Sequence, residues 1–308
     1  MNKKARKKFR SSIDITLGTN ILFHIILIAI VIMCIFPLIY VFSISISTRE
    51  SIAKYGYQLI PSEVTLDSYR MILGGGSGVP KAFGNSLFLT VAGTLSGLFI
   101  TTTYAYAVSR QDFANRGFFS MVAYIPMLFG GGMVASYIVM TQVLGLRNTF
   151  WALFLPLLLN TFNIVVMRTF FQTSVPFALI EAAKIDGATE FDIFFKVVLP
   201  ISLPGIATIA LFLSLSYWND WFNAMLYLDQ HSPHTTLQYL LMQIQRTIEV
   251  VILRGSQMGS AANDALSSLP QDGVRMAIVI ATTLPIALSY PFFQRYFIQG
   301  LTLGAVKE

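Results

Sequence analysis

Residues that could do covalent or metal chemistry are scarce in this chain. It has one cysteine, Cys34, and three scattered histidines, His24, His231 and His234. A nucleophile needs a neighbouring base and a zinc site needs three or four ligands, and neither set can be assembled from these residues. No Gly-Lys pair occurs, which excludes a P-loop for ATP. We therefore expect no catalytic residue, no metal site, no cofactor and no internal disulfide.

One stretch combines polar and apolar residues at an ordered spacing. It runs from Glu181 to Pro200 and reads EAAKIDGATEFDIFFKVVLP. A helix is predicted before it, capped by Ser174 with Pro176 in its first turn, where a missing N–H costs little. We expect that helix to end near Gly187, because a residue without a Cβ tolerates a left-handed exit.

A second short helix is predicted to follow directly. Thr189 is a suitable N-cap, with Asp192 three residues later and apolar residues after it. Leu199-Pro200 is expected to end this helix. The stretch 174–200 is therefore predicted to be a helix–turn–helix that lies between two membrane-spanning segments.

The spacing resembles the cytoplasmic signature of the membrane subunits of binding-protein-dependent ABC importers. That signature is Glu-Ala-Ala, three residues, Gly, nine residues and Ile-x-Leu-Pro, and Val197 stands here in place of Ile. The resemblance implies that this loop is a coupling helix that seats in a groove of a separate ATPase, which carries ATP and Mg²⁺. The residues it assigns to ATPase coupling are Glu181, Ala182, Ala183, Asp186, Gly187, Leu199 and Pro200.

A second polar cluster closes the next apolar segment. It comprises Tyr217, Trp218, Asn219, Asp220, Trp221 and Asn223. Helical spacing predicts that Tyr217 lies over Trp221 and Asn219 over Asn223. Aromatic faces and amides are groups that bind sugars, so these residues are candidates for a translocation pathway. The alternative is an interfacial aromatic belt, which also collects Trp and Tyr.

The composition places these stretches in a membrane protein. Hydrophobic residues make up 55% of the chain and charged residues 12%, with a mean hydropathy of +0.65. Six charge-free intervals can each hold the roughly 20 apolar residues that cross a bilayer as a helix. We predict an all-α integral membrane protein with six transmembrane helices, at about 21–46, 84–108, 118–142, 150–168, 201–223 and 276–294.

Lysine and arginine set the predicted orientation. Six of them lie in the first ten residues, and placing that end in the cytoplasm puts thirteen of the 21 inside. We therefore expect a basic cytoplasmic N-terminus at 1–20, a transmembrane permease domain at 21–295 and a cytoplasmic tail at 296–308. The stretch 174–200 then lies on the cytoplasmic side. Because the basic N-terminus directly precedes a span, we read it as a topology signal that meets anionic lipid and not as a nucleic-acid site.

Glycines in two spans predict special packing. Gly93 and Gly97 have GxxxG spacing, which allows close helix contact within the bundle or with a second membrane subunit. Gly130-Gly131-Gly132, after Pro126, predicts a weak helix centre. That weak point is interpreted as a hinge or an unwound pathway element, or as plain close packing.

The turn Leu144–Thr149, with Ala152 and Leu153 after it, resembles the maltose-type carbohydrate branch of the same importer family. The resemblance runs from about Pro126 to Leu211. It implies a permease subunit in a bacterial cytoplasmic membrane that passes an oligosaccharide or polysaccharide fragment. The implied partners are a second homologous permease subunit, a dimer of ATPase subunits and an extracytoplasmic sugar-binding protein. The sugar is not specified, although our interpretation of the resemblance is a large fragment of a plant-wall or other polymeric sugar, acidic ones included.

Two other classes of protein are alternatives. A membrane-embedded enzyme would need a set of catalytic groups that the sequence does not supply. An ATP-independent secondary transporter or channel would not associate with a nucleotide-binding subunit, so copurification distinguishes it from an importer.

Overall fold

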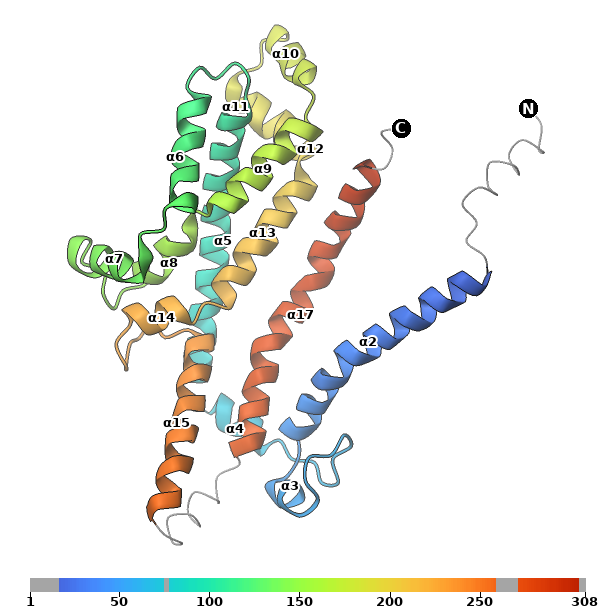
Figure 1. Ribbon diagram of the computed structural model, residues 1–308, viewed down its shortest axis with the longest axis vertical. Helices are drawn as coiled ribbons and strands as arrows, with labels where there is room; N and C mark the ends of the chain where they lie inside the picture. Colours follow the sequence, from blue (N-terminus) through green and yellow to red (C-terminus); the bar gives the residue numbers. More distant parts are fainter. Residues whose placement is uncertain (1–16, 75–77, 259–270, 305–308) are drawn as a thin grey trace. The chain divides into compact units, whose positions relative to one another are not determined.

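The computed structural model describes residues 17–74, 78–258 and 271–304, and within these ranges all regular structure is helical apart from one isolated β-bridge (Figure 1). The predicted all-α class is confirmed. The chain divides into two compact units. One contains the residues up to 69 together with 271–280, and the other contains residues 70–258 and 281–304.

The first unit is built around one long apolar helix, α2 (Leu17–Ser45), which contains Pro37. Apolar side chains are exposed along most of this helix, as expected for a helix whose neighbours are lipid or another subunit. Cys34 is exposed there too. The Ser43 hydroxyl donates to the Gln58 carbonyl at 2.8 Å, which fixes the following loop to the helix end. Helix α3 (Arg49–Tyr55) starts at Thr48, whose side chain accepts from the Ser51 amide.

Two helices contribute to both units, namely α4 (Asp67–Leu73) and α17 (Gln271–Gly304). The remaining helices belong to the second unit. They are α5 (Val79–Ser109), α6 (Arg116–Leu128), α7 (Gly132–Ile138), α8 (Trp151–Leu158), α9 (Thr161–Ser174), α10 (Phe177–Ile185), α11 (Glu190–Asp192), α12 (Leu199–Ile201), α13 (Leu203–Trp218), α14 (Phe222–Tyr227) and α15 (Leu237–Met258). Two π-helical turns, Val139–Val143 and Ile193–Val198, complete the set.

The 31-residue helix α5 is the axis of the second unit (Figure 1). It packs along α13 and α9 over much of its length and meets α8, α6 and α15 as well. Fully buried side chains between these helices include Met167, Ile209 and Leu213. Helices α10 and α11 lie toward one end of α5, and α14 and α15 lie toward the other.

The number of membrane spans depends on how bent helices are counted. Three straight helices are long and apolar enough to cross a membrane, at Gly18–Ser45, Val79–Ser109 and Asp272–Pro291. Three bent pairs qualify if each is one span, and they break by 113° after Leu128, 42° after Leu158 and 82° after Ile201. These six overlap in order with the six predicted spans. The fifth differs most, because the bent pair runs from Glu190 to Trp218 whereas the predicted span is 201–223, and only the second helix of the pair, α13, lies within the predicted span.

The break after Leu128 confirms the weak helix centre predicted from the three glycines. Helix α6 ends there, and α7 starts at Gly132, whose φ of 78° is a left-handed conformation that glycine adopts without strain. The chain turns by 113° across this point. The third predicted span is therefore a broken helix and not a continuous one.

The predicted close contact at the GxxxG pair is confirmed within the bundle. A Cβ built on Gly93 would lie 2.4 Å from the ring of Tyr217, and one on Gly97 would lie 2.9 Å from the Leu158 carbonyl oxygen. Both glycines are buried. Their missing side chains let α13 and α8 approach α5.

Gly93→Ala is therefore expected to destabilise the folded bundle by about 1–3 kcal/mol, because the buried Tyr217 ring must move. The thermal midpoint of the purified, reconstituted protein measures this. Gly84→Ala is the matched control on the same helix, since a Cβ there meets nothing within 4 Å. Equal midpoints for the two variants would contradict the close packing.

Candidate functional site

The stretch predicted as a helix–turn–helix forms two short helical segments at 177–201, called here the 177–201 pair. Helix α10 begins after Pro176, whose extended conformation (φ −61°, ψ 132°) places it in the capping position. The prediction that Ser174 caps this helix is wrong, because α9 continues through Ser174 and uses it as its last residue. The proline suits the start of α10, where no N–H is required.

The turn between the two segments is fixed by two local hydrogen-bond motifs. At the end of α10, the Gly187 amide donates to the Lys184 carbonyl and the Ala188 amide to the Ala183 carbonyl, both at 3.0 Å. This is a Schellman ending, and Gly187 has the left-handed φ of 82° that it requires. Thr189 and Asp192 then form a reciprocal capping box at the start of α11. Both predictions for this turn are confirmed.

The end of the second segment differs from the prediction. Helix α11 continues through the π-helical turn Ile193–Val198 into α12, so Leu199-Pro200 does not end it. Pro200 lies inside this continuous run, in the segment α12 directly after the π-helical turn. The chain bends only at Ser202, by 82°, before α13 begins.

A cluster of charged groups fastens the turn to the end of α5. We call it the Arg110 network, and it comprises Tyr106, Arg110, Asp112, Lys184 and Glu190. The Arg110 guanidinium binds Asp112 through two nitrogens and also reaches Glu190 Oε1 at 3.2 Å. The Lys184 ammonium contacts Asp112 Oδ2 at 2.7 Å and Glu190 Oε1 at 3.0 Å.

Tyr106 completes the Arg110 network from the last turn of α5. Its hydroxyl accepts from Arg110 Nη1 at 2.7 Å and donates to Glu190 Oε2 at 3.4 Å. Its ring lies under the guanidinium, 5.5 Å from centroid to Cζ. One cation of α10 and one carboxylate of α11 therefore bind the same loop after α5.

Arg110 is buried, and it therefore needs the hydrogen-bond partners that this network supplies. The Arg110 side chain is only 7% exposed, and a buried guanidinium is costly unless its donors are paired. The hydrogen bonds from Arg110, and then from Lys184, hold the pKa of the Asp112 carboxyl well below its usual range. The hydrogen bond to Asp112 likewise raises the pKa of Lys184, with Glu190 adding to the effect. Both shifts favour the charged forms of Asp112 and Lys184.

The 177–201 pair buries one set of apolar residues and exposes another. Ile180, Ile193 and Phe194 are buried against the bundle. Ile185 is 86% exposed and Phe191 is 78% exposed, on either side of the turn. Exposed large apolar side chains beside a rigid turn indicate a surface that another protein covers.

The residues assigned to coupling lie in this pair, but they do not all face outward. Exposed members are Glu181, Ala182, Asp186, Gly187 and Pro200, whereas Ala183 and Leu199 are half-buried. Ala183 packs against the core and receives the Ala188 amide on its carbonyl. The small side chain lets α10 lie close to the bundle, and a coupling role for these residues stays a prediction.

The predicted aromatic and amide cluster does not form one helical face. Because α13 ends at Trp218, Tyr217 does not stack on Trp221 and Asn219 does not lie over Asn223, and that prediction is wrong. Tyr217 and Trp218 are buried packing residues, whose polar atoms donate to the carbonyls of Phe154 at 2.8 Å and Thr282 at 3.0 Å.

The remainder of that cluster forms the turn between α13 and α14. Asp220 Oδ1 accepts from the Asn223 amide at 3.2 Å, a hydrogen bond that closes this turn just before α14. Asn219 and Trp221 are exposed, and Asp220 and Asn223 are half-buried. A pathway role for these four residues stays a prediction.

The turn that carries the carbohydrate-branch resemblance is also tightly built. Gly145 and Asn148 both have left-handed φ values, of 64° and 57°. The Asn148 amide donates to the Tyr227 carbonyl at 2.9 Å, and Arg147 pairs with Asp229 at 2.8 Å. The turn therefore packs on the end of α14.

Sequence reasoning missed the Arg110 network. It used Arg110 and Lys184 only to orient the spans, and it assigned no role to Tyr106, Asp112 or Glu190. The partners are 72 to 84 residues apart, so no local pattern links them. A usable signal was the cluster of charges just after a span in a chain that has few charged residues elsewhere.

Comparison with known proteins agrees with this geometry. Residues 92–303 match the family described as "Binding-protein-dependent transport system inner membrane component". The chain is 38% identical over 288 residues to the "Polygalacturonan/rhamnogalacturonan transport system permease protein YtcP" of Bacillus subtilis, covering 94% of this chain and 98% of the relative. It is 30% identical to the "Arabinooligosaccharides transport system permease protein AraQ" of Halalkalibacterium halodurans, covering 89% and 91%.

A solved structure shares the arrangement of helices. It is a chain of a bacterial ABC transporter described as "involved in the import of the acidic polysaccharide alginate". The TM-score is 0.76 at 27% identity, over 91% of this chain and 96% of the other.

Removing the central cation tests the Arg110 network. Arg110→Met is expected to lower stability by about 1–3 kcal/mol, because Asp112 and Glu190 lose a charge-assisted donor at a mostly buried position. Thermal unfolding in nanodiscs measures it. Arg147→Met is the control, since it breaks an exposed pair and exposed pairs contribute little. Equal midpoints for the two variants would show that the network does not hold the turn.

Proposed function

Because the chain belongs to the family of binding-protein-dependent transport system inner membrane components, and is a permease subunit of a carbohydrate ABC importer and not an enzyme, we propose that the 177–201 pair is its coupling element. The pair receives force from a separate ATPase and passes it to the spans. The observation that carries the proposal is the Arg110 network, which ties the pair to the axis helix α5.

The docking surface in this proposal is the exposed apolar edge of the turn. Ile185 and Phe191 are among the most exposed large apolar residues of the described chain. An ATPase groove that accepts a short helix would bury them. Glu181 and Asp186 are exposed beside them and supply charges that fix the orientation of docking.

The proposed mechanism needs a rigid connection behind that surface. Arg110 and Lys184 couple α10 to the loop after α5, and Ile180, Ile193 and Phe194 pack the pair on the bundle. A displacement of the pair therefore moves α5 with it, and α13 and α9 pack along α5. ATP can shift the transporter from 1:99 to 99:1 between two states only if it binds them unequally by about 5.5 kcal/mol.

The orientation is part of the proposal. Both termini and the 177–201 pair lie in the cytoplasm, and α14 and α15 lie outside. Two observations support it. Cations gather around the pair, at Arg110, Lys184 and Lys196, and the N-terminal ten residues carry six more.

The proposed assembly has a second homologous permease subunit, two ATPase subunits that carry ATP and Mg²⁺, and an extracytoplasmic sugar-binding protein, in a bacterial cytoplasmic membrane. The exposed apolar length of α2 supports a partner subunit or lipid along that helix. The substrate is an oligosaccharide, and an acidic one is favoured because relatives are named for polygalacturonan and alginate transport.

An ATP-independent transporter is the competing function. It would leave the exposed turn without a partner, and purified membranes would contain no associated nucleotide-binding subunit. Copurification therefore separates the two functions.

The docking surface can be tested by one charge. Phe191→Asp is expected to weaken binding of the ATPase subunits by at least about tenfold, because it places a carboxylate in an apolar contact. Pull-down of the ATPase from solubilised membranes and ATPase stimulation by loaded binding protein both measure this.

Ile60→Asp is the matched control, since Ile60 is 81% exposed but belongs to the loop between α3 and α4. It should leave ATPase binding unchanged. Full stimulation in the Phe191→Asp variant would remove the 177–201 pair from the mechanism.

A further inference from the structure

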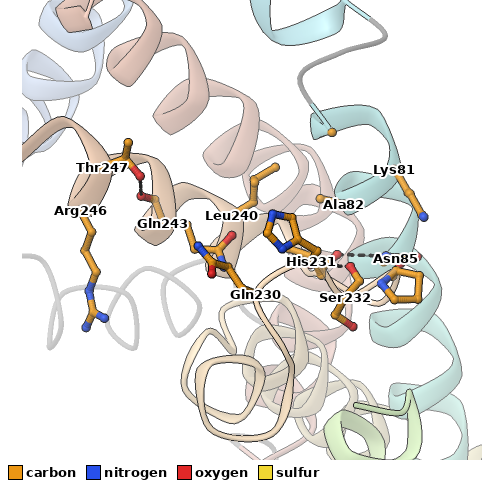
Figure 2. Close-up of a pocket in the computed structure, with 13 residues that line it drawn as sticks. Lys81, Ala82, Asn85, Gln230, His231, Ser232, Leu240, Gln243, Arg246 and Thr247 are labelled. Atoms are coloured by element: carbon orange, nitrogen blue, oxygen red, sulfur yellow. Dashed lines mark hydrogen bonds between the residues drawn. The ribbon is translucent and has the colours of Figure 1, made fainter. Parts of the chain in front are cut away.

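A polar pocket of about 580 Å³ lies at the end of the second unit opposite the 177–201 pair. Figure 2 shows its walls. Lys81 and Asn85 come from the first turns of α5, Gln243 and Arg246 from α15, and Gln230 and His231 from the loop between α14 and α15. Its volume is in the range of sites that hold small molecules.

The pocket is built by hydrogen bonds that leave its cations available. Asn85 Nδ2 donates to the carbonyls of Pro233 at 2.9 Å and Thr235 at 3.0 Å, which ties the loop to α5. The Ser86 hydroxyl accepts from the Leu237 amide at 2.8 Å and fixes the start of α15 to the same helix. The walls therefore come from three segments held in one arrangement.

The charge of the pocket has one sign. Lys81 and Arg246 line it, and none of its described lining residues is an aspartate or glutamate. The Arg246 guanidinium reaches the Met225 sulfur at 3.7 Å, and a thioether is a weak acceptor. Both cationic side chains are exposed, so a ligand can reach them.

The uncharged polar side chains of the pocket can form hydrogen bonds with the hydroxyl groups of a ligand. Gln230, Gln243 and Thr247 add amide and hydroxyl groups that can both donate and accept. Among the described residues that line the pocket there is no Phe, Tyr or Trp, so the recognition that they offer depends on charge and hydrogen bonds and not on stacking. Arginine and lysine form strong, charge-assisted hydrogen bonds with carboxylates, and the arginine guanidinium can bind both carboxylate oxygens at once.

Helix α15, which forms one wall of the pocket, and the residue before it also contact the turn that was predicted to line a pathway. Gln238 Nε2 of α15 donates to Asn219 Oδ1 at 3.4 Å, and the Thr236 hydroxyl contacts the Asp220 carbonyl at the same distance.

We propose that this pocket is a binding site for the carboxylates of an acidic oligosaccharide on the outer side of the transporter, with Lys81 on one wall and Arg246 on the opposite wall each binding a carboxylate (Figure 2). The proposal rests on the proposed function, since it places a substrate site on the side opposite the ATPase. An acidic side chain of a docked protein offers the same chemical group, and the test separates the two sources.

The assembled transporter in nanodiscs, without the binding protein, is titrated with trigalacturonate and with the neutral maltotriose. We expect wild type to bind trigalacturonate and the double variant Lys81→Gln/Arg246→Gln to bind it at least about tenfold more weakly, because two charge-assisted contacts are lost. Binding should also weaken as salt is raised, since the cations are exposed. Maltotriose affinity should not change between the two proteins.

The double variant Lys54→Gln/Arg147→Gln is the matched control. It removes two cations from segments predicted to face the same side, at positions outside the pocket, and should keep wild-type affinity for trigalacturonate. Equal affinities in both double variants would overturn the proposal, as would a wild type that does not bind trigalacturonate.

Two further results separate this proposal from the proposed function. If the pocket variant weakens docking of the binding protein while trigalacturonate affinity is unchanged, the pocket serves a protein and the proposal fails. If the reconstituted wild type imports a neutral oligosaccharide with ATP but neither binds nor imports trigalacturonate, the proposal fails while the proposed function stands. ATP-independent uptake of every saccharide tested would overturn both.

Discussion

The position of the 177–201 pair depends on the buried guanidinium of Arg110. The Arg110 side chain is only 7% exposed, so its N–H donors need acceptors within the protein. Asp112, Glu190 and Tyr106 together supply these acceptors. Lys184 contacts the same two oxygens, Asp112 Oδ2 and Glu190 Oε1, that Arg110 Nη2 binds. The favourable arrangement exists only when the turn of the 177–201 pair lies against the loop after α5. Electrostatics therefore sets the position of a pair whose own helices are too short to be stable alone.

The Arg110 network connects the 177–201 pair to α5, so a displacement of the pair would be transmitted along this helix. Helix α5 has 31 residues, which at 1.5 Å per residue is about 46 Å, and it runs from the polar pocket to the loop that holds Arg110. Glycines at 93 and 97 bring α13 and α8 directly against it. A closely packed core does not deform continuously. A displacement at one end of α5 would therefore be transmitted to the helices that pack along it.

Sequence reasoning succeeded where the determining interactions are local. Gly187 and the Thr189–Asp192 pair each follow from the chemistry of a few adjacent residues, and the break at Gly130–Gly132 follows from missing side chains. It failed where distant residues decide. Helix α9 extends through Ser174, the predicted cap of the next helix, and α13 ends at Trp218, before the predicted helix end at residue 223. The Arg110 network joins residues up to 84 positions apart, and only the fold brings them together.

The most direct measurement is thiol labelling of one exposed position of the pair. Phe191→Cys on a Cys34→Ser background can be reacted with a membrane-impermeant maleimide in right-side-out and inside-out vesicles. The account predicts labelling only from the cytoplasmic side, and protection when the ATPase subunits are bound. Labelling from the outside, or equal labelling with and without the ATPase, would contradict the claim that nucleotide chemistry enters the bundle through this turn.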